Sequence, residues 1–446
     1  MNMQRMIRKG CWAAACLVGT FAESLAAEPA LPRYTLEDGL RIGLKQSSAI
    51  LKAHEDVRIA ETRITQVRSA VLPHLSAGAG YTRLGEVSAF DFDGERVEMG
   101  RLDNYSADAE ISQLLYSGGS VQAGLKAARV YRDMARFRLE QVAHDLARDI
   151  RTGFTDILLA QAAVKVQEES VAQIEDLVRQ AEARVKKGTA PEFDLLSARV
   201  RLANEMPVLI RARKDLELAK AAFRNLIQLE DGPFEVAGEL EYRPEKKALA
   251  DWQAAGRRDR PELLYQQRAI DLARLGIRAE QGTLQPQVRA HAAYQGLNPE
   301  SGTAEDAWDW GWNAGVTLDW DLFDGGLRRA VILEKNLELA KSRADLDILQ
   351  RNVELEIQQQ HLELATADET VAASRETVAL AEKSLAIALA RYETGLSTYL
   401  EYAAAQLSVS TARLTWLTAL RDHMNALARL ECASGLGPDL AKDDAR

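Results

Sequence analysis

Strict alternation of apolar and polar side chains marks residues 308–322 as a β-strand. The even positions of this run are apolar, and the odd positions are polar or glycine. Its fifteen residues exceed the ~9–11 that a tilted membrane-spanning strand needs. Four of the seven tryptophans of the chain lie here, which is typical of an aromatic girdle at a membrane surface: Trp308, Trp310, Trp312 and Trp320. The alternative is a soluble sheet with one buried face.

The same alternation recurs in three other segments. One begins at Tyr105, which we assign to the same girdle, and the others are 75–81 and 288–294. Together the four segments predict two hairpins, at about 74–116 and about 287–323. Four strands cannot close a barrel, whereas three copies of the chain would supply twelve strands.

Two long segments have helical composition. Residues 120–187 and 327–394 are each 68 residues long and contain no proline. Each predicts a helix of about 100 Å, which is longer than a compact domain of this mass. The other predicted helices are shorter, and pairs of them stacked end to end nearly match one long helix. These shorter segments are 48–71, 191–229, 261–284 and 398–432.

The second long segment carries apolar residues on two opposite sides. Leu339, Leu346 and Val353 form a row with a spacing of seven. A second row lies about half a turn away; it contains Ala330, Leu337, Ala344, Ile348, Leu355 and Leu362. Two rows predict a helix that packs on both sides, as in a barrel of helices, although a helix inside an ordinary bundle would show the same pattern.

The chain contains an internal duplication. The YSGGS turn with Gly118 and Gly119 is repeated by the FDGGL turn with Gly325 and Gly326, at an offset of 207 residues. We expect these glycines to connect a strand to a long helix. The same offset relates Gly188 to Gly395, which predicts two helical hairpin tips. We divide the chain into a leader (1–26), a first repeat (27–230), a connector (231–258), a second repeat (259–434) and a tail (435–446).

The first 26 residues have the three parts of a secretory signal peptide. Basic residues are followed by an uncharged run from Gly10 to Ala22, and then by the small residues Ser24 and Ala26. The mature chain is therefore expected to begin near Ala27. A lipid anchor on Cys16 is an open alternative. No run of about 20 apolar residues predicts a transmembrane helix elsewhere.

Charge and motif content argue against nucleic-acid binding and against catalysis. The net charge of -10 disfavours nucleic acid as a partner, and three cysteines are too few for a disulfide scaffold. The chain lacks the phosphate-binding loop, the H-E-x-x-H zinc motif and the G-x-S-x-G nucleophile turn. Its six histidines show no ligand spacing. We expect neither an enzyme nor a metal or cofactor site.

These motifs together resemble the TolC family of outer-membrane efflux channels. The resemblance rests on the doubled glycine turns, on G-x(5)-[DE] at both tips, on RPEL at 260–263 and on LP at 72–73. It implies a mostly α-helical homotrimer with a twelve-stranded β-barrel in the outer membrane and a helical tunnel across the periplasm. It also implies a mixed equatorial domain made from the connector and the tail. The implied partners are a periplasmic adaptor and an inner-membrane pump or secretion ATPase.

The predicted tips carry the candidate functional residues. Asp194 and Glu401 follow the tip glycines by six residues and should lie in the first turn of each returning helix, where a carboxylate complements the helix dipole. Thr189 with Glu192, and Thr398 with Glu401, have capping-box spacing, and Pro191 suits a first helical turn. In a trimer the two acids would form a ring of six.

The resemblance adds a gate at these tips. It implies that Tyr392 helps to hold the tip closed by hydrogen bonding near Asp194. Ser397 stands where a related secretion channel has arginine, so Lys186 or Lys187 is the alternative cation.

Two functions of different class fit these patterns. One is a passive exit duct, and the other is a periplasmic coiled-coil spacer or adaptor that conducts nothing. The strands with one apolar face favour the duct. Whether the substrate is a drug, a metal ion or a polypeptide depends on the pump.

Overall fold

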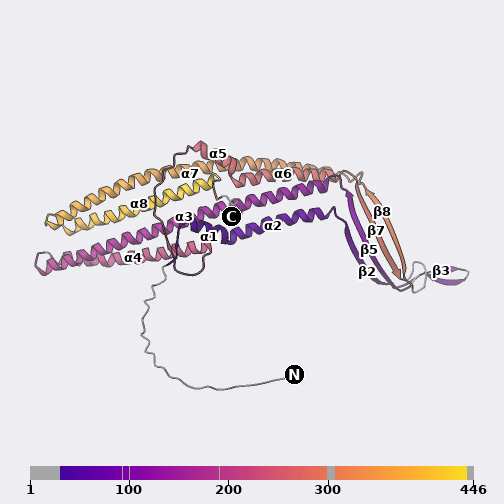
Figure 1. The fold of residues 1–446 in the computed structure, drawn as a ribbon, viewed down its shortest axis with the longest axis horizontal. Coiled ribbons are helices and arrows are strands. Elements are labelled where there is room, and N and C mark those ends of the chain that lie inside the picture. The colour runs from indigo at the N-terminus through magenta and orange to yellow at the C-terminus, as the bar shows by residue number, and fades with distance from the viewer. Residues whose placement is uncertain (1–30, 93, 100, 190, 299–306, 439–446) are drawn as a thin grey trace, which may run out of the picture.

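The computed structural model describes residues 31–92, 94–99, 101–189, 191–298 and 307–438. The predicted signal peptide, Cys16 and most of the tail lie outside these ranges. Figure 1 shows a long bundle of helices that ends at one side in a β-sheet. The chain is mostly α-helical, as the sequence predicts.

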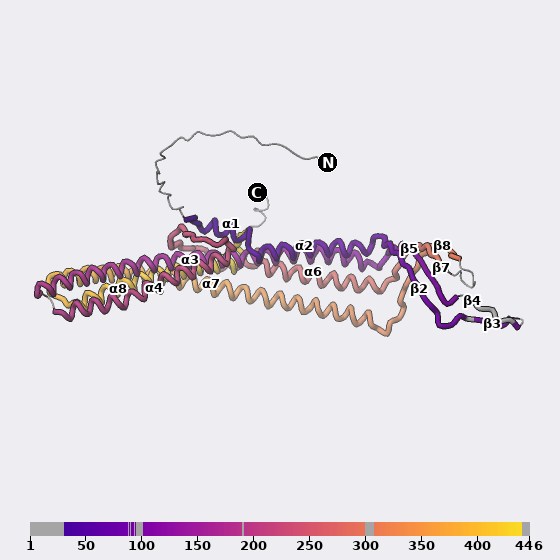
Figure 2. The backbone as a smooth tube through the Cα atoms, turned by 90° about the horizontal axis from the view of Figure 1, so that it is seen from below, coloured from indigo at the N-terminus to yellow at the C-terminus, as the bar shows by residue number. Residues whose placement is uncertain are grey.

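Two helices run the length of the bundle. These are α3 (Ser120–Lys186) and α7 (Leu327–Glu393), each of 67 residues or about 100 Å. In the half nearer the sheet, α3 packs against α2 (Ser48–Ser69) and α6 (Pro261–Gly282). In the other half it packs against α4 (Glu192–Ile227) and α8 (Tyr399–Ala433) (Figures 1 and 2). Every predicted helix is confirmed to within a few residues.

The shorter helices meet end to end halfway along the bundle. At the end of α4, the side-chain oxygen of Gln228 accepts hydrogen bonds from the Ser48 backbone N–H (3.0 Å) and hydroxyl group (3.1 Å) at the start of α2. In the second half, Arg260 precedes α6 and donates to the carbonyl oxygen of Ala433, the last residue of α8, at 3.1 Å. Both junctions therefore satisfy free groups at helix ends.

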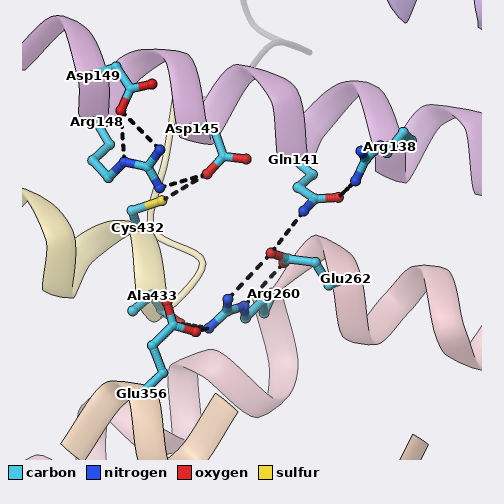
Figure 3. A network of polar contacts seen from close by, with 10 residues as sticks. All are labelled: Arg138, Gln141, Asp145, Arg148, Asp149, Arg260, Glu262, Glu356, Cys432 and Ala433. Atoms are coloured by element: carbon cyan, nitrogen blue, oxygen red, sulfur yellow. Dashed lines mark hydrogen bonds and ion pairs between the residues drawn. The ribbon is translucent and has the colours of Figure 1, made fainter. Parts of the chain in front are cut away.

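Figure 3 shows the second junction in detail. The Arg260 guanidinium pairs with Glu262 at 3.1 Å and with Glu356 at 2.7 Å, and Glu262 also accepts from Gln141 of α3 at 3.2 Å. Nearby, burial raises the pKa of Cys432 to about 11, so this half-buried thiol is not a reactive thiolate near neutral pH.

The two largest clusters of buried side chains among the described residues lie at the level of these junctions. One cluster surrounds the first junction and contains Ile50, Ile150, Phe223 and Ile227. A second cluster surrounds the other junction and contains Trp252, Leu263, Ile357 and Leu430. The connector contributes Trp252 from α5 (Leu249–Asp259). It also contributes β6 (Glu235–Val236), which pairs in parallel with β1 (Arg33–Tyr34) just before α1 (Leu36–Gln46).

The sheet has four antiparallel strands in the order β2-β5-β7-β8. Their bounds are His74–Arg83, Asp103–Tyr116, Gln287–Asn298 and Asp309–Asp319. The two predicted hairpins are β2–β5 and β7–β8, and the pairing of β5 with β7 joins them. A further hairpin, β3 (Ser88–Phe92) with β4 (Glu95–Met99), was not predicted. It extends beyond the sheet at the end away from the helices (Figure 2).

Only one of the two apolar rows on α7 is buried within the chain. Leu339 and Val353 are buried, and Leu346 packs between their two clusters. In the opposite row, Leu337, Ile348, Leu355 and Leu362 are all more than half exposed. Within the described ranges, every helix is too short or too polar to cross a bilayer.

Each long helix is preceded by a double-glycine turn, and both glycines of the turn have positive φ, in the left-handed region. Gly118 has φ 63° and its counterpart Gly325 has φ 67°, while Gly119 and Gly326 have φ near 90°. The two repeats differ in their surroundings. A Cβ atom on Gly118 would lie 2.1 Å from the carbonyl oxygen of Gly282, whereas a Cβ on Gly325 would meet nothing within 4 Å.

We predict that Gly118→Ala lowers the stability of the folded protein more than Gly325→Ala does. Both variants strain the backbone, but only the first collides with a neighbouring carbonyl, which we expect to add about 1–3 kcal/mol. Thermal unfolding of the purified protein, followed by circular dichroism, measures the difference. Equal midpoints for the two variants would contradict the prediction.

Candidate functional site at the helical tips

Both helical hairpins reverse through the same turn. In the first tip, the N–H of Thr189 donates to the carbonyl of Arg184 and that of Gly188 donates to Val185, both at 2.9 Å. In the second tip, Leu396 donates to Arg391 at 2.8 Å and Gly395 donates to Tyr392 at 3.1 Å. This is the Schellman pattern, which needs a left-handed residue at the glycine position. Gly188 and Gly395 provide it, with φ of 69° and 74°.

The returning helices begin differently in the two repeats. In α8, Thr398 is the N-cap and its hydroxyl accepts from the Glu401 N–H at 3.4 Å, which is one of the two contacts of the predicted capping box. In α4 the predicted cap by Thr189 is wrong, because Pro191 occupies the N-cap position and has no side-chain hydrogen bond. The Schellman turn assigns Thr189 to the end of α3 instead, where its hydroxyl donates to the Arg184 carbonyl at 3.1 Å. Pro191 thus stands one residue before the first turn.

The two candidate acids lie near the starts of these helices. Asp194 is in the first turn of α4, and Glu401 is in the first turn of α8. The Glu401 carboxylate also accepts a hydrogen bond from the Ser397 hydroxyl at 2.8 Å. Ser397, which stands where we expected a cation to be missing, therefore binds the Glu401 carboxylate through its hydroxyl.

Tyr392 is the centre of an aromatic cluster in which all four tip helices meet. It is only 6% exposed and packs with Leu177 of α3 and Ala198 of α4. Its ring stacks on Tyr402 (5.6 Å between centroids, 16° between planes) and meets the edge of Tyr399 (6.5 Å, 66°). Burial raises the pKa of all three phenols, so they remain neutral near pH 7.

A cation covers this cluster, and it is neither of the expected lysines. The Arg184 guanidinium carbon lies 4.8 Å from the centroid of the Tyr392 ring, which is a cation–π contact. Lys186 and Lys187 are exposed and form no ion pair within the described part of the chain. No hydrogen bond between described residues joins Tyr392 to Asp194. Burial is the main cause of the raised pKa of Tyr392, and the negative charge of Asp194 raises it further.

Sequence reasoning missed Arg184, Tyr399 and Tyr402. The two tyrosines were detectable, because a spacing of three puts them on one face of α8 and Tyr392 precedes Tyr399 by seven residues. Arg184 was not detectable, since its contact with Tyr392 joins two residues that lie 208 positions apart in the sequence.

The predicted girdle residues lie at the two ends of the sheet. Near the end away from the helices, Tyr294, Trp308 and Trp310 stack with centroids 5.2 and 5.4 Å apart, and Tyr105 contacts Tyr81 at 5.2 Å. The Trp310 ring covers Gly296, where a Cβ atom would come within 2.7 Å of it.

Trp320 lies at the opposite end of the sheet, where its indole N–H donates to the Leu284 carbonyl at 3.1 Å. The eight residue steps from Trp312 to Trp320 span about 26 Å of extended chain, which matches the ~25 Å apolar band of an outer-membrane sheet. Between the two aromatic ends, the same face carries small apolar residues such as Ala290 and Ala314.

The family model for outer membrane efflux proteins matches residues 41–227 and 255–436, which is most of the chain. The chain belongs to the outer membrane efflux protein family. This assignment confirms the resemblance predicted from the sequence. The protein is therefore an outer-membrane channel of a tripartite efflux or secretion system, located in the outer membrane and extending into the periplasm.

Three known proteins illustrate the relationship. The outer membrane efflux protein BepC of Brucella suis biovar 1 (strain 1330) is 23% identical over 364 residues, which are 81% of this chain and 76% of BepC. The alkaline protease secretion protein AprF of Pseudomonas aeruginosa is 23% identical over 326 residues, 70% of this chain and 66% of AprF. The crystal structure of CusC has the same fold, with a TM-score of 0.76 at 16% identity, and covers 91% of this chain and 93% of CusC.

We predict that Arg184→Gln loosens the tip of this efflux protein. Loss of a cation–π contact on a buried ring should cost about 0.5–2 kcal/mol, so amide exchange in residues 385–405 should become faster by roughly twofold to thirtyfold. Hydrogen exchange followed by mass spectrometry measures this change. Arg129→Gln is the control, because Arg129 is an exposed residue of the same helix and lies far from the tip. Equal exchange in the two variants would refute the role of Arg184.

Proposed function

We propose that three copies of this chain assemble into one passive exit duct, in which twelve strands close a barrel and the helices form a tunnel. One observation carries the proposal: β2 and β8 are the free edges of a four-stranded sheet whose outer strands are exposed. A free edge has unpaired N–H and C=O groups, which lipid cannot satisfy. Pairing β8 of one copy with β2 of the next removes every such edge.

The helices support the same assembly. The exposed apolar row of α7 has no partner within the described part of the chain, and α4 has a second exposed row. Burial of such rows stabilises an interface by about 25 cal/mol for each square ångström of apolar area. The α4 row includes Phe193, Leu196, Val200 and Ile210. A neighbouring copy would cover both rows.

In such a trimer, Asp194 and Glu401 contribute six carboxylates to the entrance at the tips. These acids stabilise the starts of α4 and α8 in each copy, and together they attract cations and repel anions. The Tyr392 cluster would keep the entrance narrow by holding the α7–α8 hairpin against α3 and α4. The proposed gate is thus aromatic packing covered by Arg184, with Asp194 beside it.

The duct requires partners that supply energy and substrate. Relatives act within tripartite systems, so we propose a periplasmic adaptor and an inner-membrane pump or secretion ATPase for this chain. AprF is named for the secretion of alkaline protease and BepC for efflux, so the family name alone does not select between polypeptides and small molecules.

We expect the purified protein to be a detergent-stable trimer that forms discrete conductance steps in planar bilayers. Light scattering with correction for bound detergent gives the number of chains, and single-channel recording gives the conductance. A monodisperse monomer without conductance would refute the proposed assembly.

We also expect the tip acids to set ion selectivity. Asp194→Asn combined with Glu401→Gln should shift the reversal potential in a salt gradient toward lower cation selectivity, and more strongly at low salt because screening is weaker there. Tyr392→Ala combined with Asp194→Ala should raise the single-channel conductance, because it removes the ring around which the tip cluster packs. Glu217→Gln, which removes an exposed acid farther along α4, is the matched control. Intact trimers with unchanged reversal potential and conductance would leave the acids as helix-stabilising residues only.

A further inference from the structure

The duplication of the chain extends to the pairing of its strands. In the first hairpin His74 lies opposite Ser112, and in the second hairpin Gln287 lies opposite Asp319. Gln287 follows His74 by 213 residues, and Asp319 follows Ser112 by 207. Every residue pair of β2 with β5 is related by these two offsets to a pair of β7 with β8. In the sheet, β7 is therefore the counterpart of β2, and β8 is the counterpart of β5.

One strand contact inside the chain shows how a hairpin of one repeat joins a hairpin of the other. β5 is the second strand of the first hairpin and β7 is the first strand of the second, and they pair with Ile111 opposite Ala292. The strands at the free edges of the sheet are β8, again a second strand, and β2, again a first strand. Contact between β8 of one copy and β2 of the next is therefore the counterpart of the β5–β7 contact.

The two offsets convert the contact inside the chain into the contact between copies. Ile111 corresponds to Leu318, and Ala292 corresponds to Ala79. We propose that β8 of one copy pairs with β2 of the next in this register, with Leu318 opposite Ala79 of the neighbouring copy. The register rests on the proposed trimer and specifies which residues meet at each boundary between copies.

Both faces of the sheet continue from one copy to the next in this register. Leu318 and Ala79 lie on the exposed apolar face of their strands. The next pair along, Thr317 with Gly80, lies on the polar face. Because side chains alternate between the faces, a slip of one residue would place the apolar side chains of one copy on the polar face of the next. Only registers that differ by two residues keep the faces aligned.

The glycines of the edge strands favour the proposed register over those shifted by two residues. Inside the chain, the Asp108 side chain covers Gly78 of the neighbouring strand, where a Cβ atom would lie 2.6 Å from its carboxylate. Between copies, the proposed register places Thr82 opposite Gly315. A slip of two residues one way would place Gly315 opposite Gly80, and neither strand would then have a side chain to cover the other. A slip the other way would shorten the overlap of β8 with β2.

Disulfide cross-linking of the intact, detergent-solubilised protein tests this register. The variant carries Leu318→Cys and Ala79→Cys in every chain, and both positions are exposed, so neither change empties a buried site. Directly opposite residues have Cα atoms about 4.5–5.5 Å apart, which a disulfide spans. Within one chain β8 and β2 are three strand spacings apart, or about 14 Å, so these cysteines can pair only between copies. Cys432 lies in the middle of the bundle, away from both positions (Figure 3).

Oxidation of this variant is expected to convert most chains into covalent trimers, which a denaturing gel without reductant separates from dimers and monomers. Two matched variants shift the partner cysteine by two residues on the same face: Leu318→Cys with Ala77→Cys, and Leu318→Cys with Tyr81→Cys. Their Cα atoms would lie about 7–8 Å apart. A disulfide does not span this distance without movement of the backbone, so we expect their cross-linking to be at least about tenfold slower. Each single-cysteine variant should remain uncross-linked.

Faster cross-linking of a shifted pair than of the direct pair would overturn the register and leave the proposed assembly in place. Absence of cross-linking by all three pairs, in samples that light scattering shows to be trimers, would overturn the pairing of β8 with β2. A monomer in light scattering would overturn the assembly and the register with it. The failure of the register is thus distinguished from the failure of the proposed duct.

Discussion

The whole structure depends on the end-to-end junctions that make two short helices act as one long one. A helix of about 100 Å must be covered along its entire length, and each repeat supplies only half-length helices to do so. At the first junction Gln228 bonds to Ser48 at the start of α2, and at the second junction Arg260 bonds to Ala433 at the end of α8. The largest buried side chains, including Trp252 and Phe223, cluster at this level.

Concentrating the packing at the middle of the bundle leaves its two ends free for different tasks. Toward the sheet, α7 keeps one apolar row exposed, and the sheet itself has two free edges. Toward the tips, a small aromatic cluster around Tyr392 joins the four helices. Large buried clusters in the middle and a smaller cluster at the tip agree with the gate proposed at the tip. The connector between α4 and α5 crosses the middle of the bundle (Figure 1), where the Arg243 carbonyl oxygen lies 3.1 Å from Nε2 of His423.

Duplication explains the architecture, and the differences between the repeats explain its specific contacts. Both tips use the same glycine turn, but only α8 has a side-chain cap at its start. Both double-glycine turns have left-handed backbones, but only Gly118 is crowded by a neighbouring carbonyl. The polar contacts also differ, because Gln228 completes the first junction whereas Arg260 completes the second within a network of carboxylates (Figure 3).

The sequence by itself determined the long helices, the four main strands, the tip turns and the family. These features depend on consecutive residues, since side-chain period, the absence of proline and paired glycines act locally on the backbone. It did not reveal which row of α7 is buried, that Arg184 covers Tyr392, or that His423 contacts the connector at Arg243. The contacts of Arg184 and His423 join residues that are 208 and 180 positions apart, so they arise only when packing brings distant segments together. The cap predicted at Thr189 was wrong because the Thr189 hydroxyl bonds to the Arg184 carbonyl at the end of α3 and is not at the start of α4.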